Sequence, residues 1–132
     1  MALDYRVNAR TTAAQVADLF RSSGIRRPHG DSGRVQRMTD GANLTLTAWD
    51  GMLLVGVARA LTDASYCCYL SDLAVRKEYQ GRGIGRELVR RMREHLGDEV
   101  MLLLLAAPEA MGYYARIGFE KAENAWLLPR RR

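Results

Sequence analysis

The residues with the clearest chemical potential form a short glycine-rich segment, 80–85, which reads Gln-Gly-Arg-Gly-Ile-Gly. Alternating glycines let the backbone turn tightly and approach a ligand closely. The segment precedes a predicted helix, whose free amides and dipole favour an anion. Arg82 and Arg86 add positive charge at the same place. The pattern therefore predicts a pyrophosphate site rather than a glycine-rich turn without a ligand.

Spacing excludes two common phosphate-binding loops. The P-loop ends in Gly-Lys-Ser/Thr, a triplet that the sequence lacks. The dinucleotide-binding pattern needs a glycine at its sixth place, where this chain has Arg86.

Two segments together resemble the GCN5-related N-acetyltransferase (GNAT) superfamily. In the first, Gln80, Gly83 and Gly85 match the signature Gln/Arg-x-x-Gly-x-Gly/Ala that binds acetyl-coenzyme A (acetyl-CoA). In the second, residues 113–119 read Tyr-Tyr-Ala-Arg-Ile-Gly-Phe and resemble the family's aromatic-Tyr-x-x-x-Gly-Phe element. The two segments follow each other in the family's order, separated by a predicted helix and a predicted strand.

The resemblance implies a role for each matching residue. The strand end would pair with the pantetheine arm, and a backbone amide there would polarise the thioester carbonyl. The loop amides would hold the pyrophosphate, and Tyr114 would protonate the departing thiolate. The alternative for Tyr114 is packing on the sheet, the role expected for Tyr113. Many members have Asn where this chain has Ala107. We therefore expect that turn to contact the coenzyme through its backbone or not at all. The implied binding residues are Leu73, Ala74, Val75, Gln80, Gly81, Arg82, Gly83, Ile84, Gly85, Arg86 and Tyr114.

Transfer to an amine also needs a group that removes a proton from the ammonium. The candidates are Asp72, Asp63, Glu109 and His29. Asp72 lies in an otherwise apolar strand beside the predicted cleft, where burial would suit it to proton transfer. A structural carboxylate that accepts backbone hydrogen bonds is an equal alternative. His29 is expected to be solvent-exposed in its loop. The residues expected to shape an acceptor pocket are the loop Arg26–Ser32, Trp49 and Tyr69.

The predicted elements fit an α/β (α+β) fold with a mixed, mostly antiparallel sheet flanked by helices, in the order β-α-α-β-β-β-α-β-α-β. Alternation and turn signals favour strands, with Asp50-Gly51 as a hairpin turn. Four-residue spacing of apolar residues favours a helix that ends near Leu96. The apolar run that follows is expected to be buried on both faces. We expect strands at 3–8, 43–49, 52–61, 66–75, 100–106 and 119–128, and helices at 12–23, 30–40, 84–96 and 109–117.

Length and composition limit the class of protein. The 132 residues predict a single N-acetyltransferase domain over 1–132, with a net charge of +5. The longest apolar run has eight residues, well short of the ~20 that cross a bilayer. The adjacent cysteines, Cys67 and Cys68, lack zinc-site spacing, and no leader pattern begins the chain. We therefore expect a cytoplasmic protein without a metal or a membrane partner.

The sequence thus predicts an acetyl-CoA-dependent N-acetyltransferase that acts on a primary amine of a small molecule. The alternative is a non-catalytic acyl-CoA-binding sensor or interaction domain on the same fold. A homodimer through an edge strand is compatible with this architecture. Nucleic-acid binding is the third class, because 18 of the 20 basic residues are arginines. Arg86, Arg90, Arg91 and Arg93 alternate with Glu87 and Glu94, however, which favours a solvated, ion-paired helix face.

Overall fold

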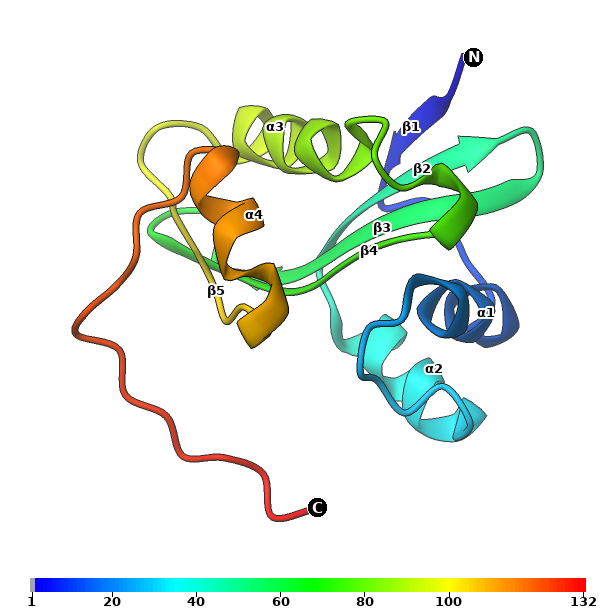
Figure 1. Ribbon diagram of the computed structural model, residues 1–132, viewed down its shortest axis with the longest axis horizontal. Coiled ribbons are helices and arrows are strands. Elements are labelled where there is room, and N and C mark those ends of the chain that lie inside the picture. Colours follow the sequence, from blue (N-terminus) through cyan, green and yellow to red (C-terminus); the bar gives the residue numbers. More distant parts are fainter. Residues whose placement is uncertain (1) are drawn as a thin grey trace.

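The computed structural model describes residues 2–132 (Figure 1). One twisted sheet lies between two helical layers, and the C-terminal segment runs outside both (Figure 1). The elements are β1 (Asp4–Val7), α1 (Ala13–Ser23), α2 (Ser32–Gly41), β2 (Leu44–Asp50), β3 (Leu53–Thr62), β4 (Cys67–Val75), the 3-10 turn η1 (Lys77–Tyr79), α3 (Ile84–Leu96), β5 (Met101–Leu104), the 3-10 turn η2 (Pro108–Ala110) and α4 (Met111–Arg116).

The five strands lie in chain order, β1-β2-β3-β4-β5. The first three pairings are antiparallel, and β4 pairs with β5 in parallel. This confirms the predicted meander and the crossover through α3. Arg59 lies opposite Asp72 in the ladder between β3 and β4, directly before a register shift at Ala60.

The N-terminal helix α1 begins and ends where the sequence predicts. The Thr12 hydroxyl accepts the Gln15 amide at 3.1 Å, and the Gln15 side chain accepts the Thr12 amide at 2.9 Å. These reciprocal bonds form a capping box that satisfies two otherwise unpaired amides. Gly24 ends the helix at φ 83°, a left-handed conformation that favours glycine.

The two faces of the sheet are covered by different helices. On one face, α3 buries its apolar stripe against β2, β3 and β4, with Leu88 and Met92 fully enclosed. On the other face, α1 and α2 contribute Leu19, Phe20 and Val35 to a second cluster. The predicted mixed fold with helices on both faces is confirmed (Figure 1). No helix within residues 2–132 is long and apolar enough to span a membrane.

Two predictions about the C-terminal third are wrong. Residues 119–128 form no strand, so β5 is the edge of the described sheet. An edge strand with no outer neighbour leaves side chains uncovered, and Met101 is accordingly 57% exposed instead of buried on both faces. Trp126 is 97% exposed in the extended segment after α4. The predicted helix over 109–117 is divided between η2 and α4.

The packing of α3 predicts a large cost for Leu88→Ala. Leu88 is 0% exposed, so truncation should leave a cavity and lower the free energy of unfolding by about 2–5 kcal/mol. Leu128→Ala is the matched control, because Leu128 is 96% exposed. Urea denaturation should show a shifted midpoint for the first variant and an unchanged one for the second. Equal midpoints would contradict the assigned core.

Candidate functional site

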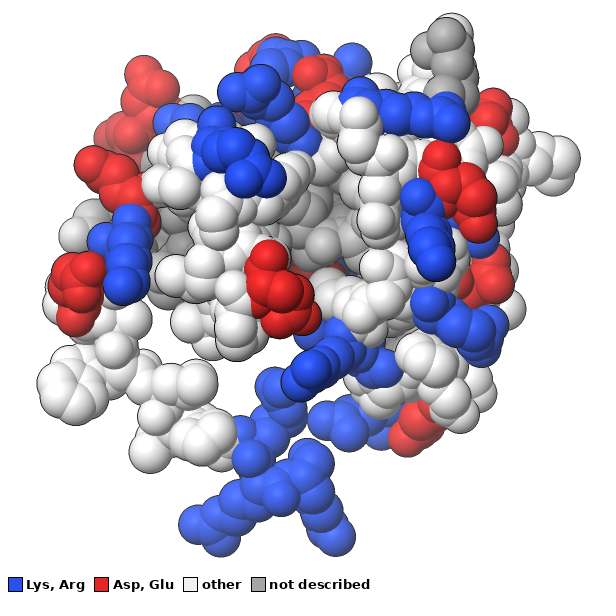
Figure 2. Space-filling model, viewed as in Figure 1, with Lys and Arg blue, Asp and Glu red and all other residues white. Residues whose placement is uncertain are grey.

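A cavity of about 1930 Å³ runs along β4, from the start of α3 to the loop between α1 and α2. Figure 2 shows that Lys and Arg side chains gather between α4 and α2, on one side of this region. The cavity brings together the predicted coenzyme-binding residues except Arg82, whose guanidinium lies 5.2 Å from the centre of the Tyr79 ring. Those lining it are Leu73, Ala74, Val75, Gln80, Gly81, Gly83, Ile84, Gly85, Arg86 and Tyr114.

The cavity opens where β4 and β5 separate. Their pairing stops at Leu70 and Leu104, whereas β3 continues to pair with β4 as far as Val75. One edge of segment 71–75 is thus held by β3, and its other edge is left without a strand partner among the described residues. Backbone groups on such an edge are available to an extended ligand.

The glycine-rich loop presents backbone rather than side chains. Gly81 and Gly83 have φ values of 80° and 82°, and a Cβ on either would meet nothing within 4 Å. Glycine is therefore required there by backbone conformation and not by crowding. Glu87 is the first residue whose amide bonds back into α3, to the Gly83 carbonyl at 3.0 Å. The preceding amides of the helix have no intrahelical acceptor, so this end of α3 suits an anion.

Gln80 fixes the loop to the rest of the fold. Its side-chain amide donates to the Val75 carbonyl at 2.9 Å and to the Ser23 carbonyl at 3.2 Å. The first signature residue therefore ties the loop both to the end of β4 and to the end of α1.

Tyr113 and Tyr114 approach the cavity from α4. The Tyr114 ring packs edge-on against Tyr113 at 5.3 Å and against Phe119 at 5.6 Å. Burial raises the pKa of Tyr114, the charge of Tyr113 raises it further, and Arg27 opposes the change. A tyrosine phenol is protonated at neutral pH, and the raised pKa keeps it so over a wider pH range, so Tyr114 has the protonation state that a proton donor requires. The Tyr113 hydroxyl lies against Gly85, where any Cβ would collide with it.

Asp72 lies beneath the cavity and does not line it. Its side chain is fully buried, and its two carboxylate oxygens accept N–H bonds from Arg27 and Arg59. Arg27 also donates to the Ser71 carbonyl at 2.7 Å, and Arg59 donates to the Met38 carbonyl at 3.1 Å. This geometry favours a structural role for Asp72 over a role as the base. The donors to its carboxylate are guanidinium groups, whereas backbone amides were expected from the sequence. The sequence reasoning missed Arg59, although an arginine within an apolar strand beside a buried Asp was a usable signal.

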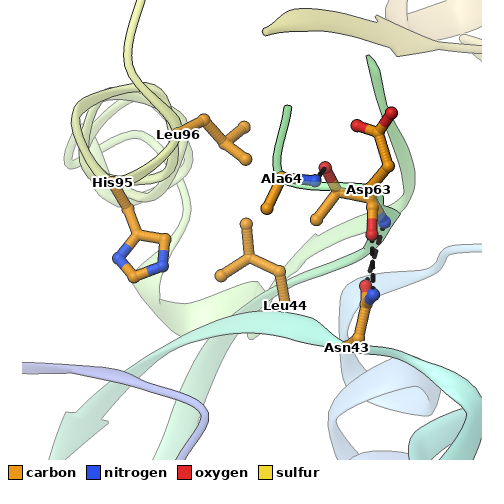
Figure 3. Close-up of a pocket in the computed structure, with 7 residues that line it drawn as sticks. Asn43, Leu44, Asp63, Ala64, His95 and Leu96 are labelled. Atoms are coloured by element: carbon orange, nitrogen blue, oxygen red, sulfur yellow. Dashed lines mark hydrogen bonds between the residues drawn. The ribbon is translucent and has the colours of Figure 1, made fainter. Parts of the chain in front are cut away.

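Of the other candidate bases, Asp63 and His29 lie outside the main cavity. Figure 3 shows Asp63 at a separate small pocket beside His95 and Leu96. Its Oδ1 accepts amides of Ser65, Tyr66 and Cys67 at 2.8–3.0 Å. These bonds lower the pKa of Asp63 to about 2, so it acts as a turn carboxylate.

His29 and Glu109 have contrasting environments. His29 is half-buried, with an Nδ1 that has no partner among residues 2–132, so the expectation of simple exposure is wrong. Glu109 is exposed and is the one carboxylate among the described cavity-lining residues.

Two of the four arginines predicted to be ion-paired on α3, Arg90 and Arg91, form such pairs. Arg90 contacts Glu87 at 2.7 Å and Glu94 at 2.8 Å, and Arg91 contacts Glu87 at 2.7 Å. This face is therefore a solvated network instead of a free basic stripe. Within residues 2–132, no group of three or more His, Cys, Asp or Glu is placed to hold a metal ion.

Comparison with known proteins defines the family. A family model described as an acetyltransferase (GNAT) domain matches residues 21–126. The chain therefore belongs to the GNAT acetyltransferase family, in agreement with the resemblance seen in the loop and α4 motifs.

The chain is 35% identical over 69 residues to GCN5-related N-acetyltransferase 2 of Arabidopsis thaliana. The matched segment covers 51% of this chain and 27% of the relative. It spans between 27% and 40% of the length of the curated relatives that it matches. A probable acetyltransferase from Staphylococcus aureus superposes with a TM-score of 0.83 at 20% identity, over 98% of this chain and 99% of the other. An aminoglycoside N-acetyltransferase, AAC(6')-Iy, in complex with CoA superposes with a TM-score of 0.70 at 15% identity, over 99% and 96%.

The Asp72 cluster predicts that Asp72→Asn destabilises the fold. A neutral amide leaves two arginines without their shared anion, and breaking a buried pair costs about 3–5 kcal/mol. Asp4→Asn is the control, because Asp4 pairs with Arg6 on the surface and such pairs contribute less than about 1 kcal/mol. Chemical denaturation at pH 7 measures both. A loss no larger for Asp72→Asn than for Asp4→Asn would remove the cluster from the stabilising interactions.

The lowered pKa of Asp63 predicts a pH-dependent contribution to stability. A carboxyl group that titrates at about 2 in the folded state and near 3.8 in the unfolded state stabilises the fold above pH 3.8. This contribution is lost as the pH falls towards 2. Asp63→Asn should therefore lower the melting temperature at pH 7, and the difference from wild type should disappear near pH 2. A difference that is the same at both pH values would refute the assignment.

Proposed function

We propose that this chain is an acetyl-CoA-dependent N-acetyltransferase that passes the acetyl group directly to a primary amine of a small acceptor. The observation that carries the proposal is a single cavity joining a phosphate-type loop, an unpaired strand edge and the Tyr114 side chain. The family supplies the class of reaction, and the site supplies the roles of the residues.

The cavity residues fit the parts of acetyl-CoA in order. The free amides that begin α3 would hold the pyrophosphate, with Arg86 adding charge beside them. The open edge of Leu73, Ala74 and Val75 would pair with the pantetheine arm, and one amide there would polarise the thioester carbonyl. When bound, acetyl-CoA supplies the activated acetyl group. AAC(6')-Iy, which shares this fold, forms a complex with CoA, and this supports acetyl-CoA as the cosubstrate.

Two side chains would handle protons. Tyr114 would donate one to the departing sulfur, because its phenol is protonated at neutral pH and it lines the cavity. Glu109 is the carboxylate available to take a proton from the acceptor, directly or through water, since Asp72 is occupied by two arginines. Asp72 then positions the site through Arg27 and takes no part in proton transfer.

The second candidate function is a non-catalytic acyl-CoA sensor on the same fold. Ala107, in the place where the resemblance leads us to expect Asn, is the observation that favours it, because the turn before η2 then lacks one side-chain contact. A sensor binds acetyl-CoA without releasing thiol in the presence of any amine.

Replacement of Tyr114 by Phe separates catalysis from binding. The ring and its packing stay, so the Kd for acetyl-CoA should be unchanged, whereas kcat should fall by about 10²–10⁴ through loss of the acid. Thiol release under saturating acetyl-CoA measures the rate, and calorimetry measures binding. Tyr113→Phe is the matched control and should keep most of kcat. An undiminished kcat in Tyr114→Phe would remove the acid role.

A further inference from the structure

We call the end of the cavity nearest α2 its acceptor end, and this end is strongly basic. The arginines that line it come from the loop between α1 and α2, from α2 and from β3, against a single lining carboxylate, Glu109. Arg27 and Arg59 share the one buried carboxylate of Asp72, so this cluster keeps one net positive charge. The arginines at this end are Arg26, Arg27, Arg34 and Arg59, and the C-terminal Arg130, Arg131 and Arg132 add the same sign of charge.

Arg26, which is exposed, and Arg34 are two arginines at this end whose guanidiniums have spare donors. Neither guanidinium forms a hydrogen bond or an ion pair within residues 2–132. Arg34 is half-buried on α2, with its backbone amide held by the Asp31 cap at 3.1 Å. A guanidinium that is partly desolvated, lines a cavity and lacks an anion is arranged to bind one.

The coenzyme does not account for these two arginines. Its phosphates belong to the loop that begins α3, and α3 packs on one face of the sheet. Arg26 and Arg34 belong to the α1–α2 layer on the opposite face. Figure 1 shows these two helical layers on either side of the strands. The positive charge at the α2 end of the cavity is therefore suited to an anion other than the phosphates of acetyl-CoA.

From this arrangement, and resting on the proposed function, we propose that the acceptor is an anionic amine: a small molecule with a carboxylate or phosphate beside its primary amine. Arg34, assisted by Arg26, binds the anion. Glu109 faces the same cavity and attracts the ammonium group. The transfer balances as follows: the amine nitrogen forms a bond to the acetyl carbon and the carbon–sulfur bond breaks. The amine proton passes to Glu109, directly or through water, and the sulfur takes a proton from Tyr114. Proton exchange with solvent then returns Tyr114 and Glu109 to their starting forms. Polycations are disfavoured, because they would place positive charge against unpaired arginines.

The test compares acceptors that differ in one anionic group. Thiol release from acetyl-CoA is measured with lysine and cadaverine, which differ by a carboxylate, and with O-phosphoethanolamine and ethanolamine, which differ by a phosphate. Spermidine and kanamycin serve as polycations. We expect kcat/KM at least tenfold higher for the anionic member of one pair, and the pair that responds identifies carboxylate or phosphate. Faster turnover of the polycations, or of the members that lack the anionic group, would overturn the inference and leave the proposed function intact.

Two variants on one helix assign the effect to Arg34. Arg34→Gln should raise the acceptor KM about tenfold to hundredfold, the range for a lost charge-assisted hydrogen bond, without changing the Kd for acetyl-CoA. Arg37→Gln is the matched control, because Arg37 lies on the exposed side of α2 and does not line the cavity. Arg34→Glu should reverse the preference towards cadaverine. Equal KM values for Arg34→Gln and wild type would overturn the proposal.

If no amine releases thiol, calorimetry of the CoA-loaded protein with the same amines replaces the rate assay. Binding of an anionic amine that Arg34→Gln abolishes would support the inference while refuting turnover. No binding of any anionic amine would overturn the inference. Failure to bind acetyl-CoA at all would refute the proposed function itself.

Discussion

The buried carboxylate of Asp72 is the contact on which the acceptor side of this molecule depends. It lies on β4, opposite Arg59 on β3, and it also binds Arg27 from the loop between α1 and α2. Arg59 reaches further, to a backbone carbonyl of α2. One anion therefore fixes two strands, a loop and a helix relative to one another. Removal of a partner from such a cluster is costly, because the remaining charges stay buried without compensation.

The two ends of the cavity use opposite means to hold charge. At the coenzyme end, charge comes mainly from backbone amides at a helix start, so glycine conformation at Gly81 and Gly83 decides the shape. At the proposed acceptor end, it comes from arginine side chains, of which Arg27 and Arg59 are held by Asp72. Backbone amides keep their charge whatever the side chains are, whereas a substitution can change the charge of a side chain without altering the fold.

Local signals in the sequence predicted much of the fold. The helix over 12–23, the Asp50-Gly51 turn and the four-residue stripe on α3 each depend on near neighbours, and each element forms as expected. Failures occurred where long-range contacts decide the outcome. The segment 119–128 has a strand-like pattern but no partner strand, and the apolar run before Ala107 lacks a second neighbour that would bury it.

The candidate site divides in the same way. The glycine loop and Tyr114 were found from motif spacing, because a helix start and a short helix carry their geometry locally. Asp72 was placed in the right strand, but its role could not be decided. Its two partners lie 13 and 45 residues away in the chain, and only the folded sheet brings them together.

The end of the sheet at β5 has a further consequence. The cleft opens because β5 diverges from β4, and β5 has no outer neighbour within residues 2–132. An uncovered strand edge is a template for pairing with another chain. The net charge of +5 opposes that encounter by mutual repulsion between copies, which dissolved salt screens over about 8–10 Å at physiological concentrations. Ionic strength therefore governs the colloidal behaviour of this chain, because it sets how closely two uncovered edges approach.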